Sequence, residues 1–556
     1  MKPRHSSPGS HALEFTRRHL KSVALSALAL GLCGEARVAV AIPVPDEPID
    51  IGTRPQLFVD DYLVDNRFAV KKSGTEMVLR KFHAPVKHGT TAVLIDPDTV
   101  PSQHAFRFDR EAKVFRIWYQ AQFPIEGRED RKPGLWPSHR HIRYAESKDG
   151  FHWTLPDLGL VEHRGNTHNN ICFARPGQFT DPRLVRTPGS GVSSMRFLNE
   201  DDMPAADRRG YKYLMTYTLR GGGKEDEDKT QVYLIGTKDG VRWDREHQMS
   251  IFTGEISDGW MGMNYDPERK KYVSYARPRD RYEGGPYKSP RNEDFLPVET
   301  KHSIYSGVVR RVGRMERDAL WTQEEAWPRT VVLPDDVDQK NEITSHMSMK
   351  VKLHGGVYFG FLIPYVPKEQ LWTELMLSRD GKSFERTHQP FIPTGKPGAW
   401  DSGQAWVTPD WVEVGDEWWI TYHGANSGPN VAIPKDTTWG IGLAKFRKEG
   451  FVSLSTPNVG GVIITRLLKW PGGDLLVNCN ASRGEMRVRV SNQGRHAFDG
   501  FNYADCVPFT GNNVAHRVAW KGHRLDELKG QNVRLEFYFS KQADLYAVRA
   551  GGGPSR

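Results

Sequence analysis

Three acidic residues, Asp258, Glu342 and Asp401, occupy corresponding positions in this chain, each just upstream of a repeated pair of hydrophobic segments. Carboxylates that converge from separate segments repel one another, so one of them tends to have a raised pKa, as a general acid requires. Cleavage of a glycosidic bond needs such a pair, one group to protonate the leaving oxygen and one to act as base or nucleophile. We therefore interpret the three acids as candidate catalytic residues. The alternative is that each one caps a strand end or hydrogen-bonds a turn.

The residues flanking the acids suggest how the roles divide. Glu342 is the candidate general acid, because partial desolvation beside Ile343 and Met347 would raise its pKa. Asp258 and Asp401 are each followed by glycine-containing segments with accessible backbone amides, so one of them would stay ionised as base or nucleophile. The same upstream segments and their neighbours supply polar and aromatic candidates for substrate binding: Asp61, Asn169, Asn170, Trp260, His346, Trp400, Gln404 and Trp406. The chain has 16 Trp and 19 Tyr, and aromatic rings of this kind stack on sugar faces.

Other chemistries find little support in the sequence. The chain contains neither a Gly-x-Ser-x-Gly elbow nor a His-Glu-x-x-His motif, and the pair His139 and His141 alone is typical of an exposed loop. The glycine-rich pieces 221–223 and 355–356 lie in turns and do not join a strand to a helix, so they do not indicate a phosphate cradle. We expect no metal ion and no cofactor.

The elements that would position the acids are hairpins repeated five times. Each repeat has a strand pair with a polar turn, followed by another strand that often ends in a charged-Gly turn and an aromatic residue. The strand pairs are residues 106–119, 210–218, 263–275, 349–361 and 411–422, and the following strands are 144–153, 233–243, 303–310, 375–384 and 440–451. A repeat that supplies about four strands is typical of a propeller blade. The pattern predicts a five-bladed β-propeller over residues 53–455, closed by the strand 56–64, with the acids in a central funnel.

The length and spacing of the predicted strands change after Gly461. Short alternating strands follow at the spacing of a sandwich, namely 462–465, 474–478, 485–491, 515–520 and 533–540. They predict a separate β-sandwich over residues 462–550. No sustained apolar pattern with the period of a helix occurs outside the first residues, so the fold class is all-β.

The N-terminal residues 1–41 have the pattern of a signal peptide. Arg17 and Arg18 precede the apolar run 23–32, which is too short to span a bilayer, and Ala39-Val-Ala41 offers small residues for cleavage. The twin arginines leave both the general secretory and the twin-arginine routes open; an ordinary unstructured tail is the alternative. We expect an exported protein, periplasmic or extracellular.

Charge and hydropathy narrow the range of partners. Without residues 1–41 the net charge falls from +9 to +5, with 71 basic residues against 66 acidic ones. The two signs are interleaved, so no nucleic-acid surface is expected. No apolar stretch after residue 41 is long enough to span a membrane. We expect a monomer whose partner is a carbohydrate.

Three cysteines remain after residue 41, Cys172, Cys479 and Cys506, and no pair has zinc-ribbon spacing. A disulfide between Cys479 and Cys506 and two buried free thiols are both compatible with the sequence of an exported protein.

With these features in view, the chain resembles secreted bacterial five-bladed propeller proteins related to glycoside hydrolase family 32. The segments that carry the resemblance are 57–64, 144–153, 158–162, 169–171 and 505–508. The wider superfamily of families 32, 43 and 68 hydrolyses or transfers fructosyl, arabinosyl and xylosyl units with three funnel carboxylates. The chain lacks the Asn-Asp-Pro-Asn, Arg-Asp-Pro and Glu-Cys-Pro motifs, so the resemblance does not imply invertase activity.

The resemblance implies an exported glycoside hydrolase-like protein that cleaves glycosidic bonds of a polysaccharide or oligosaccharide with funnel carboxylates. It also offers Asp61 as an alternative base, because the closing strand supplies the first carboxylate in related propellers. One competing hypothesis is a non-catalytic glycan-binding propeller. Another is a protein-interaction scaffold, which would have a flat charged rim and no clustered acids.

Overall fold

A computed structural model describes most of the 556-residue chain. The described residues are 47–65, 78–124, 138–186, 190–200, 202–220, 230–254, 262–278, 311–324, 328–343, 345–365, 370–428 and 437–551. The expected signal peptide and the candidates Asp258 and Trp260 lie outside them.

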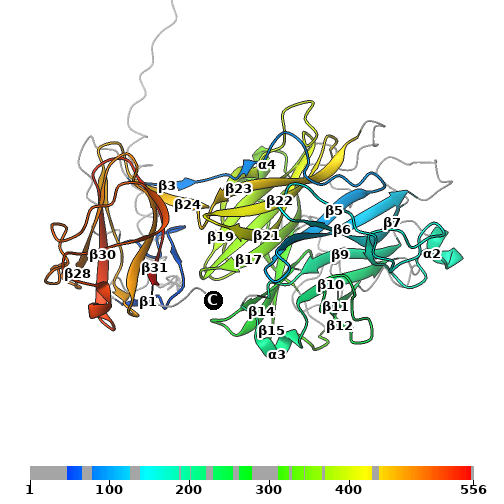
Figure 1. Cartoon of the computed structure of the whole chain (residues 1–556), viewed down its shortest axis with the longest axis horizontal. Coiled ribbons are helices and arrows are strands. Elements are labelled where there is room, and N and C mark those ends of the chain that lie inside the picture. Colours follow the sequence, from blue (N-terminus) through cyan, green and yellow to red (C-terminus); the bar gives the residue numbers. More distant parts are fainter. Residues whose placement is uncertain are drawn as a thin grey trace, which may run out of the picture.

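The described chain is nearly all β and forms two lobes (Figure 1). The larger lobe contains five groups of antiparallel strands, which we number in chain order. Group one has β5 (Val100–Asp109), β6 (Val114–Pro124), β7 (Ser138–Ser147) and β8 (Ile171–Phe173); group two has β9 (Gly191–Phe197), β10 (Tyr213–Arg220), β11 (Thr230–Thr237) and β12 (Met249–Gly254). Group three has β13 (Gly262–Asp266), β14 (Lys271–Ala276), β15 (Val312–Arg317) and β16 (Arg329–Val332). Group four has β17 (Ser345–His354), β18 (Val357–Tyr365), β19 (Leu371–Ser378) and β20 (Glu385–Ile392); group five has β21 (Gln404–Val414), β22 (Glu417–Ala425), β23 (Trp439–Arg447) and β4 (Val86–Lys87).

The first strands of the five groups contact one another in cyclic order. β5 contacts β9 and β21, β13 contacts β9 and β17, and β17 contacts β21. Short helices lie only in connections: α2 (Pro182–Arg186), α3 (Ala205–Arg208) and α4 (Asp336–Lys340). The described part of the larger lobe is therefore organised around a ring of five first strands, which we call the strand ring.

The Asp-Gly turns predicted from the sequence recur with one geometry in three groups. Asp149 accepts hydrogen bonds from the backbone amides of Phe151 and His152 through one carboxylate oxygen. Asp239 and Asp380 accept the corresponding pairs of amides in groups two and four. At Gly150, φ is 81°, and a Cβ atom would lie 2.8 Å from the Trp419 ring of group five. These acids satisfy turn geometry and pack neighbouring groups together, as expected of structural turns.

The strand that completes group five differs from the predicted one. The residues 56–64 were expected to close the ring, but β2 (Gln56–Leu57) pairs with β31 (Asp544–Gly551) of the smaller lobe. Instead, β4 pairs with β23, aligning Lys87 with Ala444 and Val86 with Lys445. Leu94 then bridges to Ile441 on the same strand. The residues 86–94 therefore close group five.

The smaller lobe combines both ends of the described chain. Its first sheet contains β1 (Ile49–Asp50), β25 (Gly461–Ile464), β26 (Leu468–Lys469), β28 (Met486–Ser491) and β30 (Asn532–Phe539). Its second sheet contains β2, β3 (Leu79–Phe82), β24 (Val452–Ser455), β27 (Asp474–Asn480), β29 (Asn512–Arg517) and β31. The 3₁₀ helix η4 (Leu525–Leu528) lies in the same region. The predicted boundaries, 53–455 and 462–550, stay a prediction, and the pairing joins residues 49–57, 79–82 and 452–455 to the C-terminal strands.

Side chains of both sheets fill one buried cluster, with Trp470, Val488, Phe537 and Leu545 at its centre. Cys479 and Cys506 are buried as free thiols, which settles the alternative left open by the sequence.

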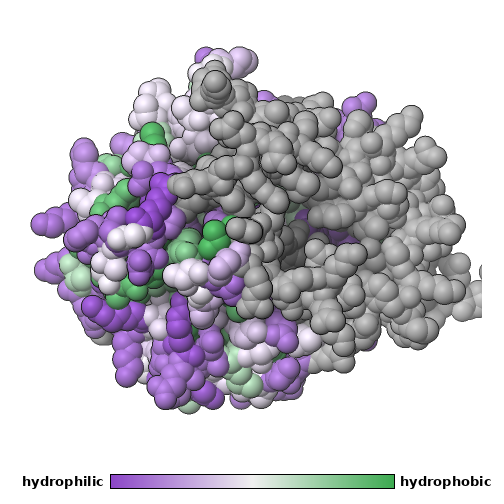
Figure 2. All heavy atoms as spheres, turned by 90° about the vertical axis from the view of Figure 1, so that its right-hand side faces the viewer, coloured by the Kyte–Doolittle hydropathy of each residue, from purple (hydrophilic) through white to green (hydrophobic). Residues whose placement is uncertain are grey.

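The described surface is mixed in character. Figure 2 shows hydrophilic residues with scattered hydrophobic ones over the coloured part of one face. Among the described residues, no helix has the length and hydropathy needed to cross a membrane.

A buried ion pair links the N-terminal segment to the smaller lobe, and its removal tests that connection. Arg534 Nη1 lies 2.5 Å from Asp65 Oδ2, and both side chains are almost completely buried. We expect Asp65→Ala to lower the free energy of unfolding by about 3–5 kcal/mol, because a buried guanidinium loses its carboxylate. Chemical denaturation measures the change.

The control is Asp50→Ala, since Asp50 lies 4.0 Å from Lys469 and is exposed. We expect it to cost about 0–1 kcal/mol. Equal effects of the two variants would contradict the assigned role of Asp65.

Candidate functional site

Three buried aspartates stand immediately upstream of first strands in the strand ring. Asp96 precedes β5, Asp338 precedes β17 and Asp401 precedes β21. Each accepts hydrogen bonds from one cationic side chain and from one tyrosine or histidine. Since β17, β21 and β5 are consecutive in the ring, these carboxylates belong to three adjacent groups.

Asp96 is held by groups on the neighbouring strands of group one. Its Oδ2 lies 2.7 Å from Arg143 Nη1 and 2.6 Å from the Tyr119 hydroxyl, which donates to it. Asn170 donates to the same hydroxyl at 2.9 Å. Burial, and then the Asp96 charge, raise the pKa of Tyr119 well above its ordinary value, so the tyrosine stays a neutral donor. Asp98, two residues on, is exposed and lies 3.9 Å from the same guanidinium.

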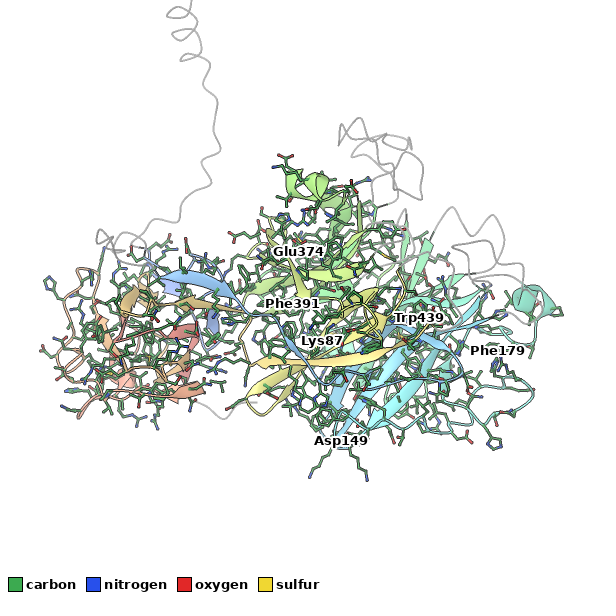
Figure 3. All side chains as sticks on the ribbon, turned by 90° about the horizontal axis from the view of Figure 1, so that it is seen from above. Lys87, Asp149, Phe179, Glu374, Phe391 and Trp439 are labelled. Atoms are coloured by element: carbon green, nitrogen blue, oxygen red, sulfur yellow. The ribbon has the colours of Figure 1, made fainter. Side chains whose placement is uncertain are left out.

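Asp338 lies in helix α4 and joins it to group four. Arg386 on β20 donates to both of its oxygens, at 2.5 and 2.9 Å, and His346 Nε2 is 3.0 Å away. The other side of this guanidinium contacts Glu374 on β19, which Figure 3 labels. Burial opposes ionisation of Asp338, yet the bonds from His346 and Arg386 hold its pKa below the ordinary range. The carboxylate is therefore charged and fixed.

Asp401 is held by the segment that closes group five. Lys87 on β4 (Figure 3) places Nζ 2.5 Å from Asp401 Oδ2, and the Tyr422 hydroxyl on β22 donates to the same oxygen at 3.1 Å. Burial and the neighbouring charge of Asp401 raise the pKa of Tyr422. The Trp400 ring, half-buried, lies 5.8 Å from the Tyr422 ring. An ionised carboxylate beside a partly exposed indole suits either a base or a sugar-binding group.

Glu342 does not have the environment that the sequence suggested. It lies in the turn after α4, before β17 begins, with φ of 58° and an exposed side chain. The argument that Ile343 and Met347 would desolvate its carboxyl group is therefore wrong for this structure. Among the described residues, no hydrogen bond or ion pair joins Glu342 to Asp401.

The predicted binding residues are dispersed over several groups. His346 holds Asp338, and Gln404 is buried and donates to the Ser427 carbonyl at 3.0 Å. Asn169 donates to the Val161 carbonyl, and Asn170 is part of the Asp96 network. Trp406 is buried, with its ring 4.7 Å from that of His423.

Asp61 lies apart from the strand ring. It is exposed and pairs with Arg80 on β3 of the smaller lobe. The reason for expecting Asp61 as a base, that its strand closes the last blade, is wrong because β4 has that position.

Sequence reasoning missed Asp96 and Asp338 and the cations that hold them. A usable signal was the segment Ile95-Asp-Pro-Asp98 directly before the first repeat, in the position that Asp401 occupies before the last. Asp338 is eight residues before His346, farther from the fourth repeat than the predicted Glu342. Arg143, Arg386 and Lys87 are distant in sequence from their partners and carried no local signal.

One cluster in this region has the donors of a metal site. Ligand atoms of Asp335, Asp338 and His388 lie within 4.8 Å of one another. The Arg386 guanidinium donates to both aspartates, at 3.0 Å and 2.5 Å, and so already supplies positive charge between them. The donor set is thereby neutralised without an ion.

Comparisons with known proteins give distant similarities only. No protein-family model and no curated protein matches the chain. Among solved structures, an N-acetylgalactosamine deacetylase from F. plautii, in complex with blood group B trisaccharide, is 15% identical, with a TM-score of 0.39, covering 66% of this chain and 96% of its own. A family 117 glycoside hydrolase from Zobellia galactanivorans is 12% identical, with a TM-score of 0.35 and coverages of 66% and 90%. A family 43 arabinoxylan arabinofuranohydrolase from Bacillus subtilis, in complex with cellotetraose, is 10% identical, with a TM-score of 0.36 and coverages of 84% and 98%.

Several of the structural neighbours are thus described as glycoside hydrolases. These similarities assign this chain to no family, and membership of the family 32-related group stays a prediction.

The Asp338 network predicts a shift in acid unfolding. A carboxyl group with a depressed pKa stabilises the fold above its unfolded pKa, and that stability is lost as pH falls through the folded pKa. We expect Arg386→Met to move the acid-unfolding midpoint to higher pH, because the pKa of Asp338 rises when the guanidinium is removed. Tryptophan fluorescence from about pH 7 to about pH 2 follows the transition.

Arg242→Met is the control, because Arg242 pairs with Asp239 on the exposed surface. It should leave the midpoint nearly unchanged. An unchanged midpoint in Arg386→Met would show that this network does not control the acid stability of the chain.

Proposed function

We propose that this chain is an exported protein of glycoside hydrolase type, which cleaves glycosidic bonds of a polysaccharide or oligosaccharide at the end of the ring where the first strands begin. The five strand groups are, in this proposal, five propeller blades around that ring. The observation that carries the proposal is the set of buried aspartates, Asp338, Asp401 and Asp96, placed before three consecutive first strands. Carboxylates from adjacent groups are the groups that hydrolysis of a glycosidic bond requires.

Strand directions support a common end for these aspartates. β7 pairs in parallel with β9, and two antiparallel steps lead from β5 to β7, so β5 and β9 run the same way. By the same reasoning through β19, the strands β17 and β21 run the same way. Parallel first strands are the arrangement of a propeller, in which their starts lie on one face.

Within this proposal Asp401 is the base or nucleophile. Lys87 and Tyr422 hold its carboxylate in a fixed orientation, and Trp400 beside it offers a partly exposed ring for a sugar face. Trp439 on β23, labelled in Figure 3, adds a second partly exposed indole from the same group. Since Asp401 is the proposed base or nucleophile, the general acid is another group.

A second function, glycan binding without cleavage, is favoured by one specific observation. Among the described carboxyl groups, those with a resolved pKa shift are all shifted downwards, as in Asp338, Asp266 and Glu536. A general acid near neutral pH needs the opposite shift. A propeller whose acids only accept hydrogen bonds would bind sugar and leave the glycosidic bond intact.

A hydrolysis screen on purified polysaccharides separates the two functions. We expect the full chain to release reducing ends from at least one glycan, and Asp401→Asn to lower that rate by about 10²–10⁴-fold, because the variant removes the base or nucleophile. Asp149→Asn, which alters a turn aspartate of similar chemistry, is the control and should keep most of the activity. Binding without release of reducing ends from any glycan would support the non-catalytic alternative.

The role of Glu342 has its own test. Activated aryl glycosides need little acid catalysis, so Glu342→Gln should slow natural glycans far more than aryl glycosides, whereas Asp401→Asn should slow both. Asp258→Asn is measured alongside, since Asp258 is the remaining carboxylate that the sequence predicts. Equal losses on both substrates in Glu342→Gln would place the general acid elsewhere.

A further inference from the structure

A small cavity, called here the axial cavity, lies where the five first strands of the strand ring meet, and every first strand contributes a side chain to its wall. The lining side chains include His104 from β5, Arg196 from β9, Asn264 from β13, Lys350 from β17 and Thr408 from β21. All five are buried. The cavity measures about 30 Å³. A site for one water needs roughly 10–15 Å³, so this space suits one or two waters or a single halide ion, and it excludes a sugar ring.

Lys350 is unusual among these residues because it is a lysine with an almost completely buried side chain. Its Nζ donates to the Val407 carbonyl at 3.0 Å and lies 4.4 Å from the centre of the Trp406 ring. Among the described residues, no carboxylate oxygen lies within ion-pair distance of this ammonium group. A lysine ammonium has three donors, and burial of its charge without a counter-charge is strongly unfavourable. Burial, and then the charge of Arg196, lower the pKa of Lys350 well below its ordinary value, so an anion bound beside it would favour the charged form.

Among the described residues, no other side chain near the cavity forms an ion pair with Lys350. Arg196 donates to Gln103 and to the Met195 carbonyl, which are both neutral acceptors. The nearest acid that lines the cavity, Asp410, lies 2.7 Å from the guanidinium of Arg107. Lys350 and Arg196 thus face one cavity whose lining carboxylate, Asp410, forms an ion pair with Arg107 and also acts through its charge on both of them.

The neutral groups of the cavity can also donate. Burial and the charge of Lys350 lower the pKa of His104 to about 3, so its imidazole is neutral, and its Nε2 shares a hydrogen bond with Thr421 Oγ1 at 2.9 Å. The Thr408 hydroxyl has no partner among the described residues, which leaves it a donor for a group inside the cavity.

We propose that the axial cavity binds one halide-sized inorganic anion, held by the Lys350 ammonium, the Arg196 guanidinium and the Thr408 hydroxyl. The anion supplies a negative charge in direct contact with Lys350, in addition to the charge of Asp410, and it connects strands β17, β9 and β21 at the centre of the ring. This site is separate from the aspartates at the strand starts, so it stands whether or not the chain hydrolyses glycans.

Thermal unfolding of the full chain tests the proposal. Sodium bromide or chloride at about 0.1 M is compared with sodium gluconate at the same ionic strength, since general screening is then equal. A halide that binds only the folded state raises Tm, and we expect a rise of roughly 2 °C or more. Crystals grown or soaked in bromide should show an anomalous scattering peak inside the cavity.

Lys350→Met keeps the length of the side chain and removes its charge, so we expect the halide-dependent rise in Tm to disappear. Lys445→Met is the matched control, because Lys445 lies over the Trp419 ring away from the cavity and should leave the rise intact. If Lys350→Met does not fold, Thr408→Val serves as the second variant and should reduce the rise. Equal Tm values in bromide and gluconate, no bromide peak in the cavity, or an unchanged rise in the Lys350 variant would each overturn the proposal.

Discussion

The pairing of residues 86–94 with β23 is the constraint on which the larger lobe depends. Without it, β23 would present an open edge of backbone amides and carbonyls, and group five would have no fourth strand. The pairing also has a chemical consequence, because it brings Lys87 to Asp401 and leads the chain directly into Asp96. Closure of the fold and assembly of two of the three buried carboxylate sites are therefore achieved by one segment.

The features of the fold that sequence could predict are local ones. Five hairpin repeats are encoded within short windows, and the described chain has antiparallel groups at them, although the predicted strand 303–310 lies outside the described residues. The Asp-Gly turns are present in groups one, two and four. Closure is a contact between residues more than three hundred positions apart. β4 has only two residues, one of them the exposed Val86, whereas residues 56–64 offered a longer hydrophobic pattern. In the structure, β2 from this segment pairs with β31 of the smaller lobe. The sequence therefore predicted a strand here correctly but predicted the wrong neighbouring strand.

The candidate site shows the same division between local and distant information. Asp401 was identifiable because it stands just upstream of a repeat, and Asp96 stands in the same relation to the first repeat. Glu342 was predicted because it stands just upstream of the fourth repeat, but helix α4 turns Asp338 inward onto Arg386 and leaves Glu342 in solvent. Each buried carboxylate is held in place by a cationic side chain, and here each of these cations comes from a strand distant in sequence.

The distribution of charge in the larger lobe constrains any catalytic mechanism. Each aspartate at the strand starts is paired with a cation, which suits a hydrogen-bond acceptor and, in the proposed hydrolase, a base or nucleophile. A proton donor must instead be a carboxyl group that is shielded from water and has no cation beside it. Glu342 is exposed in the turn before β17, so in the proposed hydrolase a glycan seated over it would exclude water from its carboxyl group. In the proposed hydrolase, a general acid formed in this way would exist only in the complex with sugar.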